Sequence, residues 1–146
     1  MRNYDDARRG TPQEPNYIKQ VVSFEGLKFT GGSGLMNATP TDIDGYLQLD
    51  SINAFIFFEL KYKGGMPTGQ KRAYEKLVDA INDGGGTAIL ILAVHGQDRG
   101  VINARNAIVT QIYSRYDGVN TKWYTPKSKQ PLWKYLKNFI ERQEKK

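Results

Sequence analysis

Three carboxylates and a lysine are grouped in a way that could bind a metal ion. Asp42 and Asp44 lie close together, and Glu59 and Lys61 stand one residue apart further along the chain. Carboxylate oxygens are the ligands that hard divalent cations prefer, and a nearby lysine can stabilise negative charge that develops in a reaction. Several charged groups at the end of an apolar strand cost free energy without a partner. A divalent cation is the natural partner here.

A β-hairpin is predicted to bring these residues together. The sequence predicts a hairpin over 46–58, with a turn at 50–53 and an unbroken apolar strand over 54–58. If Leu49 pairs with Ala54, the antiparallel register fixes the neighbours of every residue that follows. Side chains alternate with period two, so the four polar groups then share one face of the sheet. The expected cross-strand pairs are Asp44 with Glu59 and Asp42 with Lys61.

A helix and a further strand are predicted after the hairpin. Thr68 is a candidate N-cap for a helix over 69–82, and the apolar run 87–94 is typical of a strand covered on both faces. A strand–helix–strand unit of this length is a right-handed crossover, so strand 87–94 should run parallel to the strand that carries Glu59. The helix residues expected to face inward are Ala73, Tyr74, Leu77, Val78 and Ile81.

The spacing of the polar residues resembles the PD-(D/E)XK nuclease superfamily. Asp44 is followed by 14 residues and then by Glu59-Leu60-Lys61, across a hairpin. Either 40–42 (Pro-Thr-Asp) or 42–44 (Asp-Ile-Asp) stands where that family has Pro-Asp. The segment 59–77 is most similar to archaeal Holliday-junction resolvases and virus-type replication-repair (VRR-NUC) nucleases, some of which are small and phage-encoded. The resemblance covers roughly residues 17–95.

The resemblance implies a fold and a reaction. The fold is α/β with a restriction-endonuclease-like core, a mixed sheet of four or more strands flanked by helices. The reaction is hydrolysis of DNA phosphodiester bonds with Mg²⁺ or Mn²⁺, in recombination, replication or repair, by a structure-selective, junction-resolvase-like endonuclease. Asp44, Glu59 and the Leu60 carbonyl would hold the metal, and Lys61 would orient water or stabilise developing charge. Asp42 is an alternative ligand, a second-metal ligand or a turn residue.

Other interpretations of the same residues stay open. An Asp/Glu/Lys cluster can be a cross-strand ion network without catalysis, and the alternative function is a non-catalytic nucleic-acid-binding or interaction protein that keeps the fold. Gln70 and Tyr74 share a helix face at i and i+4. By resemblance Gln70 helps position the site. Tyr74 belongs to the apolar stripe, which favours core packing.

Composition predicts one folded unit in a reducing compartment. The 146 residues suit a flexible arm over 1–16 and a single nuclease-like domain over 17–146. The chain has no cysteine, and no apolar run is long enough to cross a membrane. A cytoplasmic location is expected, which would be the host cytoplasm for a phage protein. DNA is the expected partner, with target choice resting on DNA shape, on a homodimer or on a partner protein.

The positive charge lies in an aromatic-rich segment over 122–146. The chain has 21 Lys and Arg against 15 Asp and Glu, of which this segment holds eight against two, so residues 1–121 hold 13 against 13. Interleaved cations and aromatics favour nucleic-acid binding. Apolar residues at helical spacing over 131–143 favour a docked terminal helix instead, and the two interpretations are compatible. The lysines proposed to contact phosphates are Lys127, Lys129, Lys134 and Lys137.

The stretch 103–116 is ambiguous. Its alanines and isoleucines recur at helical spacing, whereas 107–113 alternates like a strand.

Overall fold

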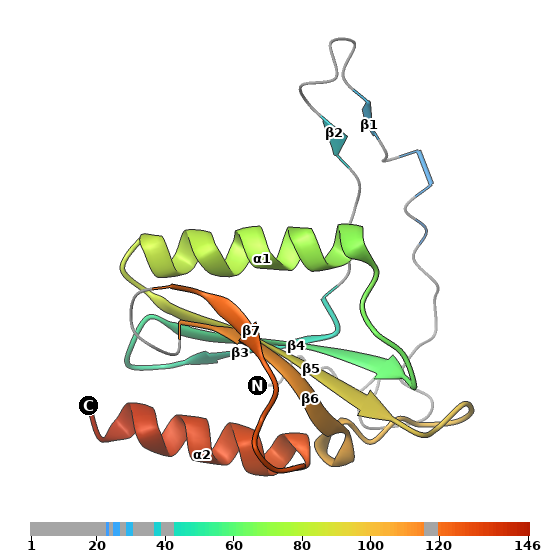
Figure 1. Cartoon of the computed structure of the whole chain (residues 1–146). Helices are drawn as coiled ribbons and strands as arrows, with labels where there is room; N and C mark the ends of the chain where they lie inside the picture. The colour runs from blue at the N-terminus through green and yellow to red at the C-terminus, as the bar shows by residue number, and fades with distance from the viewer. Residues whose placement is uncertain (1–22, 24, 27–28, 31–36, 39–42, 116–119) are drawn as a thin grey trace, which may run out of the picture. The chain divides into compact units, whose positions relative to one another are not determined.

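The computed structural model describes residues 23, 25–26, 29–30, 37–38, 43–115 and 120–146 (Figure 1). The chain forms two compact units, residues 1–42 with 99–101 and residues 43–98 with 102–146. In the first unit, β1 (Phe29–Thr30) pairs antiparallel with β2 (Asn37–Ala38). The predicted arm over 1–16 and the candidate ligand Asp42 lie outside the described residues.

The second unit is built on a mixed five-stranded sheet in the order β3-β4-β5-β6-β7. Strands β4 and β5 run parallel, and the other neighbouring pairs are antiparallel. This confirms the predicted α/β class, the mixed sheet and the parallel crossover. The strands are β3 (Gly45–Leu49), β4 (Ala54–Tyr62), β5 (Thr87–His95), β6 (Ile108–Ser114) and β7 (Lys122–Tyr124).

The hairpin β3–β4 has the predicted register. Leu49 pairs with Ala54, and the ladder runs without a shift to Gly45 opposite Phe58. The next step along both strands places Asp44 opposite Glu59. Glycine at position 45 leaves room for the Phe58 ring, which would have to shift if residue 45 had a Cβ.

Helix α1 (Thr68–Asp83) covers one face of the sheet, as Figure 1 shows. The predicted cap at Thr68 is wrong: Pro67 occupies the N-cap position, and no side chain caps the helix. Tyr74 and Val78 are buried as predicted, whereas Leu77 is 36 % exposed and not inward. Helix α1 is held from the β6–β7 side by Tyr113 and Trp123, whose hydroxyl and indole N–H donate to carboxylates of α1. This leaves Leu77 at the margin of the contact.

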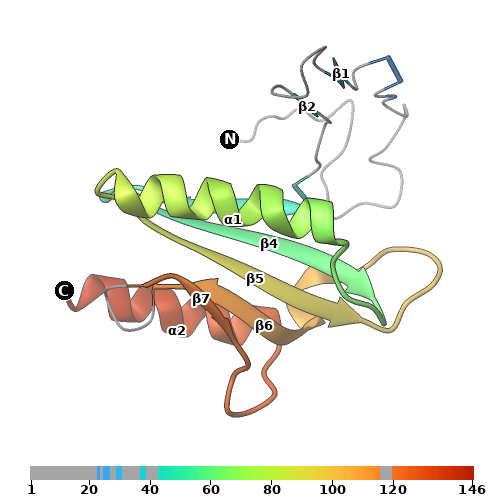
Figure 2. The ribbon, with the colours of Figure 1, turned by 45° about the horizontal axis from the view of Figure 1, so that its top comes forward.

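Helix α2 (Leu132–Glu144) packs on the opposite face of the sheet, so the sheet lies between two helices (Figure 2). Leu132 and Phe139 are buried against Ile112 and its neighbours in the sheet, with Tyr135 and Ile140 packed around them. Burial of this apolar stripe holds the terminal helix in place. The predicted docking of the aromatic tail is thereby confirmed.

The described part of the ambiguous stretch, residues 103–115, contains a strand preceded by a short 3₁₀ turn. A 3₁₀ turn (Ala104–Asn106) precedes β6, which is paired on both sides, with β5 and β7. The β5–β6 register shifts at Leu92, opposite which β6 carries the extra residue Thr110, and the Thr110 hydroxyl donates to the Leu92 carbonyl (3.2 Å). As a strand, residues 108–114 form backbone hydrogen bonds with both β5 and β7, and a helix over the same residues could not form them. Among the helices that the structure describes, none combines the length and the apolar character needed to span a membrane.

Candidate active site

Glu59 is the buried centre of the polar cluster. Its side chain is 3 % exposed, yet both carboxylate oxygens have partners. The Tyr74 hydroxyl donates to Oε1 (2.8 Å), and Gln70 Nε2 donates to Oε2 (3.0 Å). Lys61 Nζ forms an ion pair with Oε2 (3.0 Å). Three donors compensate for the loss of water, so the carboxylate is held in one orientation.

Lys61 and Gln70 complete a closed ring with Glu59. Lys61 Nζ donates to Gln70 Oε1 (2.9 Å) and pairs with the carboxylate to which Gln70 donates. Lys61 lies two residues after Glu59 on β4, so both side chains leave the same face of the strand. Gln70 comes from the first turn of α1. The lysine side chain is 23 % exposed and therefore reaches solvent with its position already fixed.

Asp44 faces Glu59 from the start of β3. Its Oδ2 accepts a hydrogen bond from the Leu60 N–H (2.8 Å). Partial burial raises the pKa of Asp44 above its usual value, and the charge of Glu59 and a hydrogen bond with Glu59 raise it further. The Leu60 N–H and the charge of Lys61 act in the opposite direction. Two carboxylates in such contact repel each other unless a positive charge lies between them. A proton can supply that charge, and so could a metal cation.

The direction of the Leu60 carbonyl follows from the hydrogen bond of its N–H group to Asp44. In an extended strand, the N–H and the C=O of one residue point to the same neighbour. Because the Leu60 N–H bonds to Asp44, we infer that its carbonyl also faces the β3 side. The three atoms expected to hold a metal thus come from one end of one hairpin.

The few protein ligands suit Mg²⁺ or Mn²⁺, which keep water ligands, better than a cation that is bound by protein atoms alone. Within 43–115 and 120–146 and the shorter described segments, no group of three or more His, Cys, Asp or Glu side chains is arranged to hold a metal. Two carboxylates with one carbonyl leave positions for water and substrate, as is usual for Mg²⁺. Asp42, the other candidate ligand, lies outside the described residues.

The Tyr74 hydroxyl is a part of the site that the sequence analysis did not assign. The ring is 2 % exposed and packs in the core as predicted, while its hydroxyl reaches Glu59. Burial, first, and the neighbouring Glu59 raise the Tyr74 pKa, so the phenol stays protonated and remains a donor. The i, i+4 spacing with Gln70 was the available signal, since both side chains point from α1 toward β4.

The four lysines proposed to contact phosphates lie away from this ring. Lys134 and Lys137 are on the exposed surface of α2, which packs on the other face of the sheet. Lys127 and Lys129 are exposed in the segment between β7 and α2. The structure therefore leaves all four accessible to a ligand.

The pKa of Asp44 predicts opposite effects of pH on stability and on metal binding. Because this pKa is raised on folding, protonated Asp44 favours the folded state, and this contribution is lost as pH rises through the raised pKa. A cation competes with the same proton, so Mg²⁺ and Mn²⁺ affinity should increase over that pH range. Calorimetric metal titrations and thermal unfolding of the metal-free protein at several pH values measure the two effects.

Asp44→Asn is the control for this prediction. The amide oxygen can still accept from the Leu60 N–H, but the side chain no longer titrates. Both pH dependences should then flatten. A metal affinity that does not change with pH in the unsubstituted protein would contradict the predicted competition.

Comparison of the chain with protein-family models, with curated proteins and with solved structures found no match.

Proposed function

We propose that this protein is a divalent-metal-dependent nuclease that hydrolyses DNA phosphodiester bonds. The observation that carries the proposal is the pairing of Asp44 with Glu59 beside a fixed lysine. Phosphodiester hydrolysis needs groups that hold a hard cation and a positive charge near the developing negative charge. One hairpin brings both to the same end of the sheet.

The chain's own residues have distinct roles in this proposal. Asp44, Glu59 and the Leu60 carbonyl hold Mg²⁺ or Mn²⁺, with Asp42 as a further candidate. The bound cation would supply a Lewis acid for the phosphoryl oxygens and lower the pKa of a water molecule. Lys61 orients the attacking water or stabilises charge on the phosphate. Gln70 and Tyr74 hold Glu59, and Gln70 also holds Lys61, so these two are positioning residues.

Within the nucleases, we favour a structure-selective endonuclease of the junction-resolving kind, acting in recombination, replication or repair in the cytoplasm. The resemblance of 59–77 to resolvase and replication-repair nucleases supports this narrower choice. A homodimer would supply two such sites to a branched DNA.

The test is incubation of the full chain with Mg²⁺ or Mn²⁺ and a panel of single-stranded, duplex, flap and four-way DNAs. Metal-dependent cleavage of any of these supports the nuclease, and preference for the four-way junction supports the narrower proposal. Addition of EDTA should stop the reaction, and excess Mg²⁺ should restore it. An inactive protein with both metals on every substrate would overturn the proposal.

A non-catalytic nucleic-acid-binding protein is the competing function, and one observation favours it. Lys61, Gln70 and Tyr74 already satisfy both oxygens of Glu59 without a metal. A cluster satisfied in this way can persist for stability alone. Binding to the same DNA panel without cleavage would support this alternative.

The basic tail predicts a salt-dependent contribution to DNA binding. Neutralising Lys127, Lys129, Lys134 and Lys137 to glutamine should weaken binding. The log–log salt slope should fall by roughly one unit for each lysine that neutralises a phosphate in the complex. Cleavage at saturating DNA should survive, because the substituted residues lie away from Glu59. Fluorescence anisotropy over a salt series measures the slope.

Two exposed lysines elsewhere serve as the control for the tail. Lys63 and Lys76 are exposed and lie far from the tail in sequence, so Lys63→Gln and Lys76→Gln set the effect of charge loss alone. Unchanged affinity and slope in the fourfold tail variant would leave these lysines as a solvated helix face.

A further inference from the structure

A cavity lies at the end of the sheet where β5 begins, whereas Glu59 lies near the other end, where β4 finishes. It is open to solvent, has a volume of about 790 Å³ and is lined by the end of α1, the first residues of β5, the ends of β6 and β7, the segment between β7 and α2, and the C-terminal half of α2. This volume falls in the range of small-molecule sites, roughly 300 to 1,000 Å³. In Figure 1 the C-terminal end of α2 lies at the end of the sheet opposite the arrowheads of β4 and β5. The cavity is therefore separate from Asp44 and Glu59, which lie at the other end of the hairpin.

The charged residues that line the described part of the cavity are all cationic. They come from four places along the sequence, and no Asp or Glu is among the described lining residues. Asp83 pairs with one of them, Arg115, at 2.6 Å. Several like charges around one cavity repel each other and create a positive potential that favours an anion. The cationic lining residues are Arg115, Lys122, Lys127, Arg142 and Lys146.

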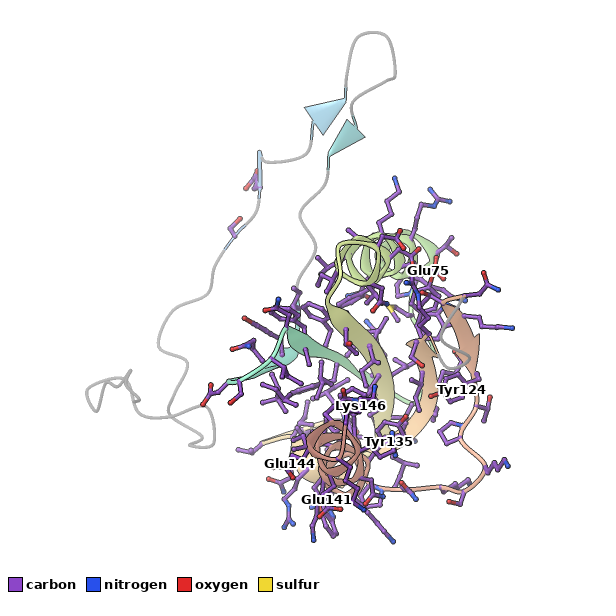
Figure 3. All side chains as sticks on the ribbon, turned by 90° about the vertical axis from the view of Figure 1, so that its left-hand side faces the viewer. Glu75, Tyr124, Tyr135, Glu141, Glu144 and Lys146 are labelled. Atoms are coloured by element: carbon purple, nitrogen blue, oxygen red, sulfur yellow. The ribbon has the colours of Figure 1, made fainter. Side chains whose placement is uncertain are left out.

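The acidic residues of α2 are turned away from the cavity. Tyr135, Phe139 and Arg142 recur at i, i+4 and i+7 and share the face that lines it. Glu141 and Glu144 lie on the other side of the helix, as Figure 3 shows, away from Tyr124 and Tyr135. The helix thus presents Tyr135, Phe139 and Arg142, but not its carboxylates, to the cavity.

The inner wall is apolar and aromatic, with a few hydroxyls. Ile112 and Phe139 are buried there, and the Arg142 guanidinium lies 5.8 Å from the Phe139 ring centroid. The Tyr124 and Tyr135 hydroxyls are 3.4 Å apart, and the Ser114 hydroxyl donates to that of Tyr124 (3.3 Å). Such a wall suits a planar organic group, which an isolated inorganic anion does not have.

We propose that this cavity binds a nucleoside phosphate, either a free nucleotide or the terminal nucleotide of a strand. The phosphate lies among Arg142, Lys127 and Lys122. The base lies against the partly exposed Tyr124 and Tyr135, which cover the buried Ile112 and Phe139. Cations at the opening and an aromatic floor are the combination that recognises phosphate and base together. This inference does not rest on the nuclease activity, since neither Glu59 nor a metal takes part.

Tyr135 brings an uncharged hydroxyl to the wall of the cavity. Burial, first, and the neighbouring Tyr124 raise the Tyr135 pKa, so the phenol is uncharged at neutral pH. An uncharged hydroxyl can donate to a phosphate or a base without repelling it.

The experiment is a calorimetric titration of the full chain in EDTA with four probes. These are adenosine 5′-monophosphate, adenosine, inorganic phosphate and a short 5′-phosphorylated single strand. The monophosphate should bind at least about tenfold more tightly than adenosine or phosphate alone, because each of these lacks one half of the recognised group. The 5′-phosphorylated strand binding more tightly than the monophosphate indicates a strand end, and equal binding indicates a free nucleotide.

Arg142→Gln tests the site itself. Arg142 is exposed at the helix surface, so the variant should fold, and its thermal unfolding confirms this. Nucleotide affinity should fall by about tenfold or more as a charge-assisted hydrogen bond is lost. The control is Arg105→Gln, an exposed arginine that stacks on Trp133 but does not line the cavity. Glu59→Gln should leave nucleotide binding unchanged, which separates this proposal from the proposed nuclease.

Two results would overturn the inference. One is no detectable binding of the monophosphate or of the 5′-phosphorylated strand by the unsubstituted protein. The other is an equal decrease of affinity in Arg142→Gln and Arg105→Gln, which would assign the effect to net charge and not to the cavity.

Discussion

Glu59→Gln and Asp44→Asn should each reduce metal-dependent cleavage of DNA by about a thousandfold or more. Each removes an anionic ligand of the proposed cation, and the cation lowers the free energy of the transition state by several kcal/mol. The two variants should differ in stability. The buried Glu59 carboxylate accepts from Tyr74 on one oxygen and from Lys61 and Gln70 on the other. An amide has a single acceptor oxygen, so its NH2 group would face one of these donors. Asp44→Asn keeps the acceptor for the Leu60 N–H, so its fold should be the better preserved.

Asp50→Asn is the matched control for this result. Asp50 is exposed in the turn of the same hairpin, and its substitution changes the net charge equally. Single-turnover cleavage, Mg²⁺ titration and thermal unfolding together separate loss of the metal from loss of the fold. Full activity of Asp44→Asn with unchanged metal affinity would remove Asp44 from the proposed ligand set and leave Asp42 as its replacement.

Lys61→Ala should lose turnover by about 10²- to 10³-fold while metal affinity stays within a few-fold of that of the unsubstituted protein. A protonated lysine has no lone pair to offer a cation, so its role is confined to water and phosphate. The loss should appear in kcat more than in KM, because the charge that Lys61 stabilises develops only as the reaction proceeds.

Lys76→Ala provides the comparison for the lysine. Lys76 is exposed on α1 and carries the same charge. Metal affinity is measured by calorimetry, and cleavage by gel assay under the same conditions. If Lys61→Ala abolished metal binding as completely as Glu59→Gln, the ring of Glu59, Lys61 and Gln70 would act as one structural unit and the separate role of the lysine would be wrong.

The sequence by itself determined the hairpin and the pairing within it. The apolar run 54–58 and the turn at 50–53 admit one antiparallel register that buries the right face, and a slip by one residue would send every side chain to the opposite face. That register is enough to set Asp44 opposite Glu59 and to keep Lys61 on the same face. These are local relations between residues fewer than 20 positions apart, which periodicity can specify.

The sequence also predicted that a helix and then a strand follow the hairpin, but it did not predict how the helix packs on the sheet. The apolar stripe of α1 predicted both Val78 and Leu77 as inward, yet only Val78 is buried. The rotation of the helix is influenced by hydrogen bonds from Tyr113 and Trp123, which come from strands 34 and 48 residues away. Amphipathic periodicity identifies a face only to within about one residue on either side.

For several residues the sequence allowed more than one interpretation, and only the tertiary structure distinguished between them. The stretch 103–116 fits either element by its pattern, and pairing with both β5 and β7 makes Ile108–Ser114 a strand. Tyr74 fits the core by its spacing, and only the approach of α1 to β4 brings its hydroxyl to Glu59. The cationic cavity joins residues of β5, β6, β7 and α2, whose proximity depends on how the sheet is ordered and where α2 docks. Non-local contacts of this kind leave no periodic signal in the sequence, because each contributing segment is also consistent with an ordinary solvated surface.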